Sequence, residues 1–528
     1  MRNEFVFFSI VSLLLVFGIY QYIWPPVIWS LIVLLPILLL GYYDMLQSRH
    51  AIMRNFPILG RGRYIFEELR PKIYQYFIES ETDGTPIPRM LRSIVYQRAK
   101  NEISTTPFGT QLDVYRVGYE WITHSIGAIP INELNPHPRV RVGGKDCMQP
   151  YELSIFNVSA MSYGSLSNRA ILSLNGGAQK AGFAHNTGEG GISPYHITPG
   201  GDLIFQFGTG YFGCRDEKGN FDPLLFKDKA EMDNVKMIEI KLSQGAKPGH
   251  GGLLPATKNT EEIARIRHIL PGIAVHSPAY HTAFDSPVGL LEFVQELRDL
   301  SLGKPVGFKL CVGRPSEFIA ICKAMLETGI LPDFISVDGG EGGTGAAPLE
   351  YTNSMGMPLL EGLTFVHDML RGFGLRDEIR LLVSGKIMTG FGIYRAMALG
   401  ADACYSARGM MFALGCIQAL ECHKNTCPTG VATQDKELVA GLKVKDKTER
   451  VANFHLNTVS KFVELLGSSG KRTPSDILRK DVFRRINTYE VKSFETMYPT
   501  TPYGSFKYGE IPERWKSEFD YARIDSFA

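Results

Sequence analysis

Residues 333–348 read DFISVDGGEGGTGAAP, a short apolar strand candidate that runs directly into a glycine-rich loop. The same pairing of an apolar run with a turn-forming loop recurs along the chain. The other candidates are ELSIFNVS (152–159), AGFAHNTG (181–188), MIEIKLS (237–243), GIAVHS (272–277), VGFKL (306–310), IRLLVSG (379–385) and ADACYSARG (401–409). Helical stretches such as PSEFIAICKAML (315–326) separate them. Eight strand–helix units predict an α/β fold, a (β/α)8 TIM barrel, rather than an open doubly wound sheet.

Composition limits the function classes. The 528 residues carry 56 basic and 54 acidic side chains, so nothing in the charge balance indicates a nucleic-acid partner. Eight cysteines are too few for a secreted disulfide scaffold of this length, and a reducing compartment suits the sequence. No G-x-G-x-x-G fingerprint opens a helix after the first strand candidate, which argues against a Rossmann dinucleotide site.

The N-terminal residues have a different composition. Two apolar runs, FVFFSIVSLLLVFGIY (5–20) and VIWSLIVLLPILLLGYY (27–43), each approach the ~20 residues that a membrane-spanning helix needs. Arg2 precedes the first run and Arg49, Arg54, Arg61 and Arg63 follow the second, so the positive-inside rule places both ends in the cytoplasm. A cleaved signal peptide is the alternative, but no small-residue cleavage site follows the first run.

These patterns divide the chain into segments. We expect a two-pass transmembrane hairpin over 1–47, a basic and mostly helical connector over 48–130, the barrel over 131–435 and a helical C-terminal extension over 436–528. Within the connector, helical apolar spacing is seen in residues 64–79 and 90–103. The barrel would then lie at the cytoplasmic face of the cell membrane.

Glycine-rich loops follow the last three strand candidates. They are DGGEGGTGAAP (338–348), SGKIMTGFG (384–392) and SARGMM (406–411). In a TIM barrel the loops after strands 7 and 8 commonly bind a phosphate, and glycine lets backbone N–H groups approach it. Lys386 or Arg408 would add positive charge there. Tight turns also use glycine, but together the three loops predict a phosphate-bearing cofactor.

Charged side chains stand at the ends of several strand candidates. Lys309 lies in VGFKL, where a lysine inside an apolar strand is costly unless it meets an anion. A reduced flavin would be such an anion, and a lysine that reaches solvent at the strand end is the alternative. Glu189, Gln244 and Lys247 follow the second and third strand candidates.

Five motifs, in order, resemble the FMN-binding synthase domain of glutamate synthase. They are AMSYGSLS (160–167), NTGEGG (186–191), IEIKLSQGAKPGHGG (238–252), GGTGAAP (342–348) and CHKNTCPTGVATQ (422–434). The likeness spans residues 100–450, and the chain length and apolar N-terminus are similar to the small stand-alone members of that family.

The resemblance implies roles for individual residues. Ser162, Gln244, Lys309 and the loops containing Gly343, Thr344, Gly345, Gly385 and Gly409 would hold FMN. Glu189, Lys247 and Arg267 match positions that contact 2-oxoglutarate, and Lys309, Glu189 and Lys247 would be the catalytic residues.

Three cysteines are closely spaced near the end of the barrel segment. Five residues separate Cys416 from Cys422 and four separate Cys422 from Cys427. In glutamate synthases this spacing holds a 3Fe–4S cluster, and thiolates are the ligands that iron–sulfur clusters use. A zinc site would usually want a fourth ligand, for which His423 is the nearby candidate, and purely structural thiols are the other alternative.

Several features depart from the family pattern. Leu253 stands where the family usually has Gln, in GHGGLLP, and SPAYHTAFDS (277–286) replaces the usual PPPHHD run. An N-terminal glutaminase with a cysteine nucleophile, a C-terminal β-helix and a nicotinamide motif are not recognised, so electrons would come from a ferredoxin, another subunit or the membrane.

Three functions therefore compete. The first is reductive amination of a 2-oxo acid by ammonia or an amine with reduced FMN. The second is an amino-acid dehydrogenase that passes electrons through the cluster to quinone, and the third is a flavin-binding membrane scaffold or sensor without turnover. The sequence leaves the direction of electron flow and the oligomeric state open.

Overall fold

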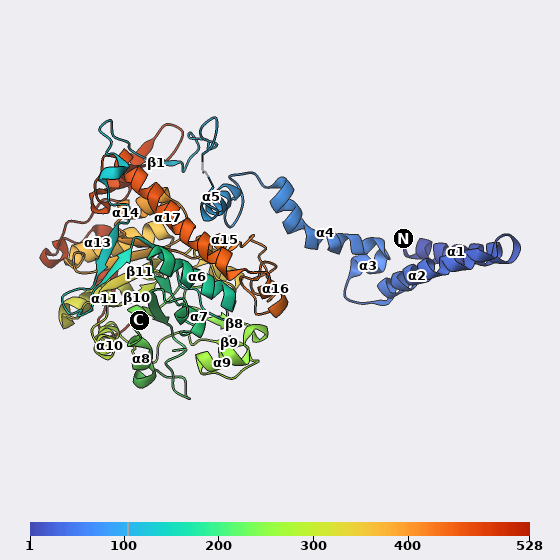
Figure 1. Cartoon of the computed structure of the whole chain (residues 1–528), viewed down its shortest axis with the longest axis horizontal. Coiled ribbons are helices and arrows are strands. Elements are labelled where there is room, and N and C mark those ends of the chain that lie inside the picture. The colour runs from blue at the N-terminus through green and yellow to red at the C-terminus, as the bar shows by residue number, and fades with distance from the viewer. Residues whose placement is uncertain (103–104, 528) are drawn as a thin grey trace. The chain divides into compact units, whose positions relative to one another are not determined.

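The computed structural model describes residues 1–102 and 105–527 and divides the chain into two compact units, Met1–Thr85 and the part from Pro86 onward. Ile103, at the end of the helix predicted over 90–103, lies outside the described residues; that helix is α5 (Arg89–Ala99). Figure 1 shows the course of the whole chain.

The N-terminal unit is helical. Its elements are α1 (Arg2–Tyr22), η1 (Pro25–Ser30), α2 (Leu31–Leu46), α3 (Ala51–Asn55), α4 (Leu59–Ile73) and the π-turn η2 (Tyr74–Ile78). Within the described residues, Arg2–Tyr22 and Pro25–Leu46 are long and apolar enough to cross a membrane. Their apolar side chains are mostly exposed, and the two helices approach closely where Gly41 lies against the ring of Phe5.

The second unit contains a closed parallel barrel, as the sequence predicts. Among the described residues eight strands close it, in the order β4 (Phe156–Val158), β5 (His185–Asn186), β6 (Leu203–Phe207), β7 (Val235–Lys241), β10 (Val306–Leu310), β11 (Phe334–Asp338), β12 (Arg380–Ser384) and β13 (Ala403–Ser406). Helices begin at caps such as Ser167 and Thr389 and several end at left-handed glycines such as Gly182, so the chain turns sharply between layers.

One predicted barrel strand was wrong, and one barrel strand was not predicted. GIAVHS is not a barrel strand: its β9 (Val275–His276) pairs antiparallel with β8 (Leu253–Leu254) in an excursion after β7. The third barrel strand is instead β6, LIFQF, which the sequence analysis missed. Short apolar runs bounded by turns look alike in sequence, and only their pairing partners separate them. Gln244 and Lys247 therefore follow the fourth barrel strand, and Lys309 keeps its place on the fifth.

Helices and loops surround the barrel. Those of the second unit are α5, α6 (Asn168–Ala181), α7 (Pro194–Ile197), α8 (Pro223–Ala230), α9 (Glu261–Arg267), α10 (Pro287–Leu300), α11 (Pro315–Thr328), α12 (Leu349–Ser354), α13 (Leu359–Phe373), α14 (Gly390–Ala398), α15 (Arg408–Leu414), α16 (Lys436–Ala440), α17 (Val444–Ser468), α18 (Phe494–Met497) and α19 (Glu513–Tyr521). Single 3-10 turns lie at η3 (Ile131–Glu133), η4 (Ala256–Lys258), η5 (Pro474–Asp476), η6 (Arg479–Asp481) and η7 (Ser505–Tyr508).

The barrel interior changes from apolar to polar along its axis. At the end where the strands begin, an apolar cluster includes Met237, Phe334 and Leu382, and the hairpin β2 (Arg139–Val142)–β3 (Tyr151–Ser154) adds Val142 and Leu153 to it. Further along, the buried Glu239 carboxylate accepts hydrogen bonds from Asn186 (2.7 Å), Gln206 (2.6 Å) and Ser336. A buried carboxyl group with three donors is tolerated because its lone pairs are satisfied.

The C-terminal segment covers the outside of the barrel. The long helix α17 packs against α5, α6, α14 and α15, and Figure 1 shows it crossing the barrel beside α6. The helical C-terminus was predicted, but the sequence analysis missed the strands β14 (Val482–Arg485) and β15 (Val491–Ser493). These form an antiparallel sheet with β1 (Glu120–Ile122).

Candidate active site at the carboxyl ends of the barrel strands

The carboxyl ends of the strands surround a hollow of about 290 Å³. It is lined by Glu189, Thr209, Lys241, Leu242, Ser243, Gln244, Gly249, His250, Gly251, Gly252, Pro278 and Ala279. These residues come from loops after β5, β6 and β7 and from the loop after β9. This end of a TIM barrel is where the active site lies in characterised enzymes of the fold.

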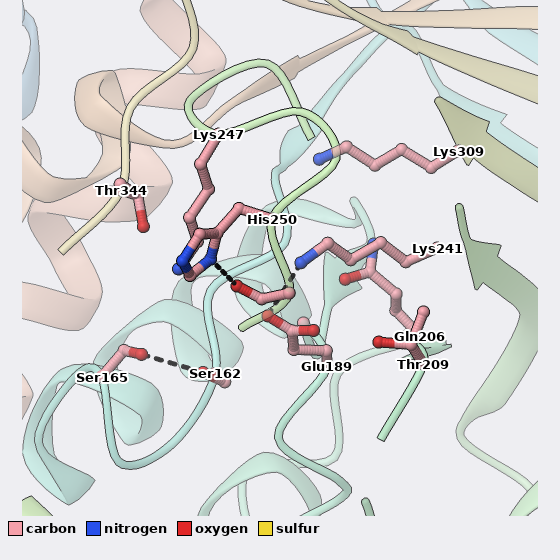
Figure 2. A network of polar contacts seen from close by, with 12 residues as sticks. Ser162, Ser165, Glu189, Gln206, Thr209, Lys241, Lys247, His250, Lys309 and Thr344 are labelled. Atoms are coloured by element: carbon pink, nitrogen blue, oxygen red, sulfur yellow. Dashed lines mark hydrogen bonds and ion pairs between the residues drawn. The ribbon is translucent and has the colours of Figure 1, made fainter. Parts of the chain in front are cut away.

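Glu189 forms an ion pair at the base of the hollow. Lys241, the last residue of β7, donates from Nζ to Glu189 Oε1 at 2.8 Å (Figure 2). Burial by itself would raise the pKa of Glu189, but Lys241, Lys247 and Arg267 together hold it below its usual value. Glu189 is therefore an ionised carboxylate at neutral pH.

Lys247 and Arg267 place further positive charge beside this carboxylate. Burial lowers the pKa of Lys247 to about 8, although Glu189 favours its charged form, and its Nζ donates to Ala346 O at 3.2 Å. Arg267, at the end of α9, donates to Tyr163 O at 2.9 Å and lies over the ring of Phe212 at 5.3 Å. Three cations thus share one carboxylate, and the group keeps an excess of positive charge.

Lys309 points into the barrel on β10, where a reduced flavin was expected from the sequence as its anionic partner, and the protein itself supplies an anion there. Its Nζ lies 3.1 Å from Asp338 Oδ2 on β11. Asp338 also accepts from Ser384 Oγ and, at 2.9 Å, from Gly245 N. Burial opposes the charge of both groups, yet their attraction raises the pKa of Lys309 and lowers that of Asp338. The two residues meet because β10 and β11 are adjacent parallel strands.

Two further basic residues, Lys386 and Arg408, lie after β12 and β13, with Glu341 near both. Burial lowers the pKa of Lys386 and of Arg408, and repulsion from Arg408 adds to the effect on Lys386. Lys386 has a left-handed backbone, with φ of 53°, a strained conformation that is common at functional sites. Gly343 packs against the Arg408 side chain, and Arg408 Nη2 donates to Glu341 O at 2.6 Å.

The remaining predicted residues surround the same opening. Ser162 Oγ lies 3.1 Å from Ser165 Oγ and 3.5 Å from Arg267 Nη2. Thr344 is exposed, and its hydroxyl contacts Ala346 O at 3.4 Å. Gly385 precedes Lys386 in the loop after β12, and Gly409 follows Arg408 in the first turn of α15. Figure 2 shows Ser162, Lys247, Lys309 and Thr344 arranged around Glu189 and Lys241.

The three predicted cysteines lie close enough to influence one another. Burial raises the pKa of Cys416 to about 12, and Cys422 and Cys427 add to that effect. The Cys427 sulfur is different: burial opposes its charge, but Thr429 and the backbone N–H groups of residues 429, 431 and 432 lower its pKa. Gln418 N also donates to Cys416 Sγ at 3.4 Å. Burial also raises the pKa of Cys422, so of the three sulfurs only that of Cys427 has donors that lower its pKa below the usual value.

Lys258 adds a buried cation beside this loop. Its side chain is almost fully buried, and its Nζ donates to Ser165 O at 3.1 Å and Ala432 O at 2.7 Å. Burial lowers its pKa to about 8, while Cys422 and Cys427 favour its charge. Lys258 therefore joins the cysteine loop to the Ser162–Ser165 loop of the hollow.

Across residues 1–102 and 105–527, no three His, Cys, Asp or Glu side chains are grouped so that they would hold one metal ion. The donors around the Cys427 sulfur suit a thiolate, the ligand that both zinc sites and iron–sulfur clusters use.

A family comparison decides the assignment. The profile described as "Conserved region in glutamate synthase" matches residues 133–472. The chain belongs to the glutamate synthase family. It is an oxidoreductase of that family, with an N-terminal pair of apolar helices in addition.

Relatives support this membership. The glutamate synthase large subunit-like protein YerD of Bacillus subtilis is 36% identical over 86% of this chain and 94% of its own length. The archaeal glutamate synthase [NADPH] of Methanocaldococcus jannaschii is 38% identical, but the match covers 59% of this chain and 58% of that protein. Among solved structures, a flavocytochrome b2 variant with pyruvate bound aligns with 85% of this chain and 91% of its own at a TM-score of 0.43 and 12% identity.

Within this family member, the departures noted in the sequence have clear positions. Leu253 lies on β8, where it pairs with His276, and it is not among the residues that line the hollow. His281, in the unusual 277–286 loop, interacts through Nε2 with Lys241 O at 3.0 Å and through Nδ1 with the Tyr211 hydroxyl at 3.0 Å. The divergent loop thus supports the strand end that carries Lys241.

Four residues that shape the site were not predicted from the sequence: Lys241, Glu239, Asp338 and Lys258. Lys241 and Asp338 are the last residues of β7 and β11, and Lys309 is the penultimate residue of β10, so a charged residue at the end of an apolar run was a usable signal. Nothing in the local sequence indicated that Lys258 would meet the cysteine loop, 158 positions or more along the chain.

Proposed function

We propose that the protein is a glutamate synthase-like flavoprotein that reductively aminates a 2-oxo acid, 2-oxoglutarate or a close relative, with ammonia or an amine. The observation that carries this proposal is the group formed by Glu189, Lys241, Lys247 and Arg267 at the hollow. Three cations around one carboxylate leave a net positive charge that favours an anionic substrate with more than one acidic group.

The chain's own residues can then act on such a substrate. Arg267 and Lys247 would orient carboxylates, and Glu189 would keep both cations in place. Lys247, with a pKa of about 8, holds a proton at neutral pH and can release it as charge develops on the reacting oxygen or nitrogen. When bound, reduced FMN supplies the hydride that converts an imine carbon to an amine carbon.

FMN fits the features of the same opening. Lys386 and Arg408 lie after the seventh and eighth barrel strands, the usual phosphate position, with Gly385 and Gly409 allowing close approach. Lys309 and Gln244 would contact the flavin ring system, and Ser162 and the loop of Gly343, Thr344 and Gly345 would complete the site. The neutralising contact with Asp338 means that Lys309 contributes less net charge than an isolated lysine.

We further propose that Cys416, Cys422 and Cys427 bind a 3Fe–4S cluster that exchanges electrons with the flavin. The hydrogen-bond donors around Cys427 and the ammonium of Lys258 support this, because both stabilise thiolate charge. A ferredoxin, another subunit or quinone would be the external electron partner.

We propose that Arg2–Tyr22 and Pro25–Leu46 form a two-pass anchor with the barrel on the cytoplasmic side, followed by a connector to about residue 130 and a barrel domain from 131. A membrane anchor also suits the second candidate function, an amino-acid dehydrogenase that delivers electrons to quinone. A third candidate is a flavin-binding scaffold without turnover; Leu253, where the family usually has an amide, lies on β8 outside the lining of the hollow and does not favour it.

The proposal is tested with anaerobically purified full-length protein. Visible absorption, flavin extraction and iron and sulfide analysis should give FMN and three irons per chain. With a low-potential electron donor, 15N-ammonia and 2-oxoglutarate, labelled glutamate should form. Reduction of the flavin by amino acids, without amination, would instead establish the dehydrogenase, and flavin inert to both oxo and amino acids would exclude both enzymes. Deleting residues 1–47 should move the protein from membranes to the soluble fraction.

A further inference from the structure

Helix α4 presents an uncovered apolar face. Leu59, Phe66, Leu69 and Ile73 follow one another at intervals of seven, three and four, so they share one side of the helix. Phe66 is 67% exposed and Leu59 is also 67% exposed, and the face continues into Phe77, which is 85% exposed. Such a stripe of large apolar side chains on one helix marks an interaction surface.

The charged side chains of α4 are ordered around this face. At 100° per residue, Arg63 and Arg70 fall near one edge of the face and Lys72 near the other, while Glu67 and Glu68 fall farther round. Arg63 and Glu67 form an exposed ion pair at 2.7 Å. Basic residues at both edges of an apolar face, with Glu67 beside Arg63 and Glu68 farther from the face, match a helix lying in a bilayer surface rich in anionic lipid.

Hydrogen bonds to Asp44 form a fixed corner that connects α4 to the end of α2. The fully buried Asp44 accepts two hydrogen bonds from Arg61, at 2.7 Å from Nη2 and 2.9 Å from Nε, and one from Ile58 N at 3.1 Å. Ile58 has a φ of 64°, which is strained for a β-branched residue, and Gly60 packs directly on the backbone of α3. Because Asp44 lies in the last turn of α2, α4 begins at the level where that apolar helix ends.

A second copy of the chain fits this face less well than an anionic membrane surface does. Read as a heptad, Leu59, Phe66 and Ile73 occupy one core position and Leu69 the other. Arg63, Arg70 and Lys72 would then fall at the flanking positions that pair between helices. All three are cationic, so self-association along this face would bring like charges together.

We propose that α4 lies in the cytoplasmic surface of the membrane and binds anionic phospholipid headgroups through Arg63, Arg70 and Lys72, with its apolar face in the acyl boundary. This rests on the proposed anchoring through α1 and α2. The corner at Asp44 sets the direction of the helix, and the lipid charge holds it. The two-pass anchor thus becomes a three-helix membrane contact.

Hydrogen exchange of the full-length protein in nanodiscs tests the proposal. In discs with phosphatidylglycerol, α4 amides should exchange more slowly than in discs of phosphatidylcholine alone. Replacing both Arg70 and Lys72 with Gln should reduce that protection roughly 30-fold, the product of about fivefold for each surface charge. Phe66→Glu should remove it, while Gln75→Glu, which adds the same charge away from the apolar face, should leave it.

The outcomes separate the two proposals. Fast exchange in Arg2–Tyr22 and Leu31–Leu46 would overturn the anchoring itself. Slow exchange there with fast exchange of α4 in both lipids would overturn only the surface helix. Protection of α4 that disappears in Phe66→Glu but is independent of lipid charge would also overturn it, and discs loaded with one or two copies would then show whether a second copy covers the face.

Discussion

Replacing Lys309 with Met should destabilise the barrel by about 3 kcal/mol at neutral pH. The variant leaves the buried Asp338 carboxylate without its cation, 3.1 Å away in the native protein. Removing one partner of a buried ion pair typically costs about 3–5 kcal/mol. The lower end of that range of free energies applies here because Ser384 Oγ and Gly245 N still donate hydrogen bonds to the Asp338 carboxylate.

The loss should depend on pH in a defined direction. In the native protein, burial favours the neutral acid, but Lys309 holds the pKa of Asp338 below its usual value. That stabilisation is present above the unfolded pKa, about 3.9, and is lost as the pH falls through the lower folded pKa. In Lys309→Met burial prevails and the pKa of Asp338 rises. Protonation then removes the buried charge, so the difference between variant and native protein should shrink as the pH falls from 8 towards 5.

The assay is thermal unfolding of detergent-purified protein followed by near-UV circular dichroism at several pH values. Differences in Tm are compared rather than free energies, because a chain of several parts does not unfold in a single two-state step. The control is Lys309→Met combined with Asp338→Asn, which removes both charges and should recover much of the loss. A loss of equal size at every pH, or a double variant as unstable as the single one, would refute the reasoning.

Further predictions follow from the same site. In FMN-loaded protein, Lys309→Met should lower the flavin reduction potential by tens of millivolts and Asp338→Asn should raise it. The size follows because ~1.4 kcal/mol corresponds to about 30 mV for a two-electron couple. Potentials of the two variants that move in the same direction would contradict this. Glu189→Gln should lower the pKa of Lys247, because Lys247 loses a neighbouring carboxylate and keeps the repulsion of Lys241. The alkaline limb of the pH–rate profile should therefore shift to lower pH by about one unit or more. The control is Glu449→Gln, which removes the carboxylate of an exposed ion pair with Lys180. Cys422→Ser should remove iron while Cys147→Ser keeps it, as iron analysis would show. Lys258→Met should lower the cluster potential in redox titrations followed by electron paramagnetic resonance, and an unchanged potential would make Lys258 a packing residue.

Much of the architecture could be predicted from local pattern. Alternating strand and helix units indicated the barrel, because each unit buries its apolar side only by stacking beside the next. The two N-terminal runs were recognisable as helices from composition, and the order of motifs indicated the family. Glu189 and Gln244, which line the hollow, were singled out from the sequence because they follow strands that end there.

Pairings between distant parts of the chain could not be predicted from local sequence patterns. GIAVHS and LIFQF are both short apolar runs. GIAVHS pairs with Leu253 and Leu254 and lies outside the barrel, whereas LIFQF pairs with β5 and β7 and belongs to it. Asp338 meets Lys309 because β10 and β11 are neighbours in register, and Lys258 meets Cys422 and Cys427 from a separate excursion. The sequence specifies which side chains are ionisable, but the partner and the burial that set the pKa of each side chain depend on distances in space. Those distances exist only once the barrel has closed.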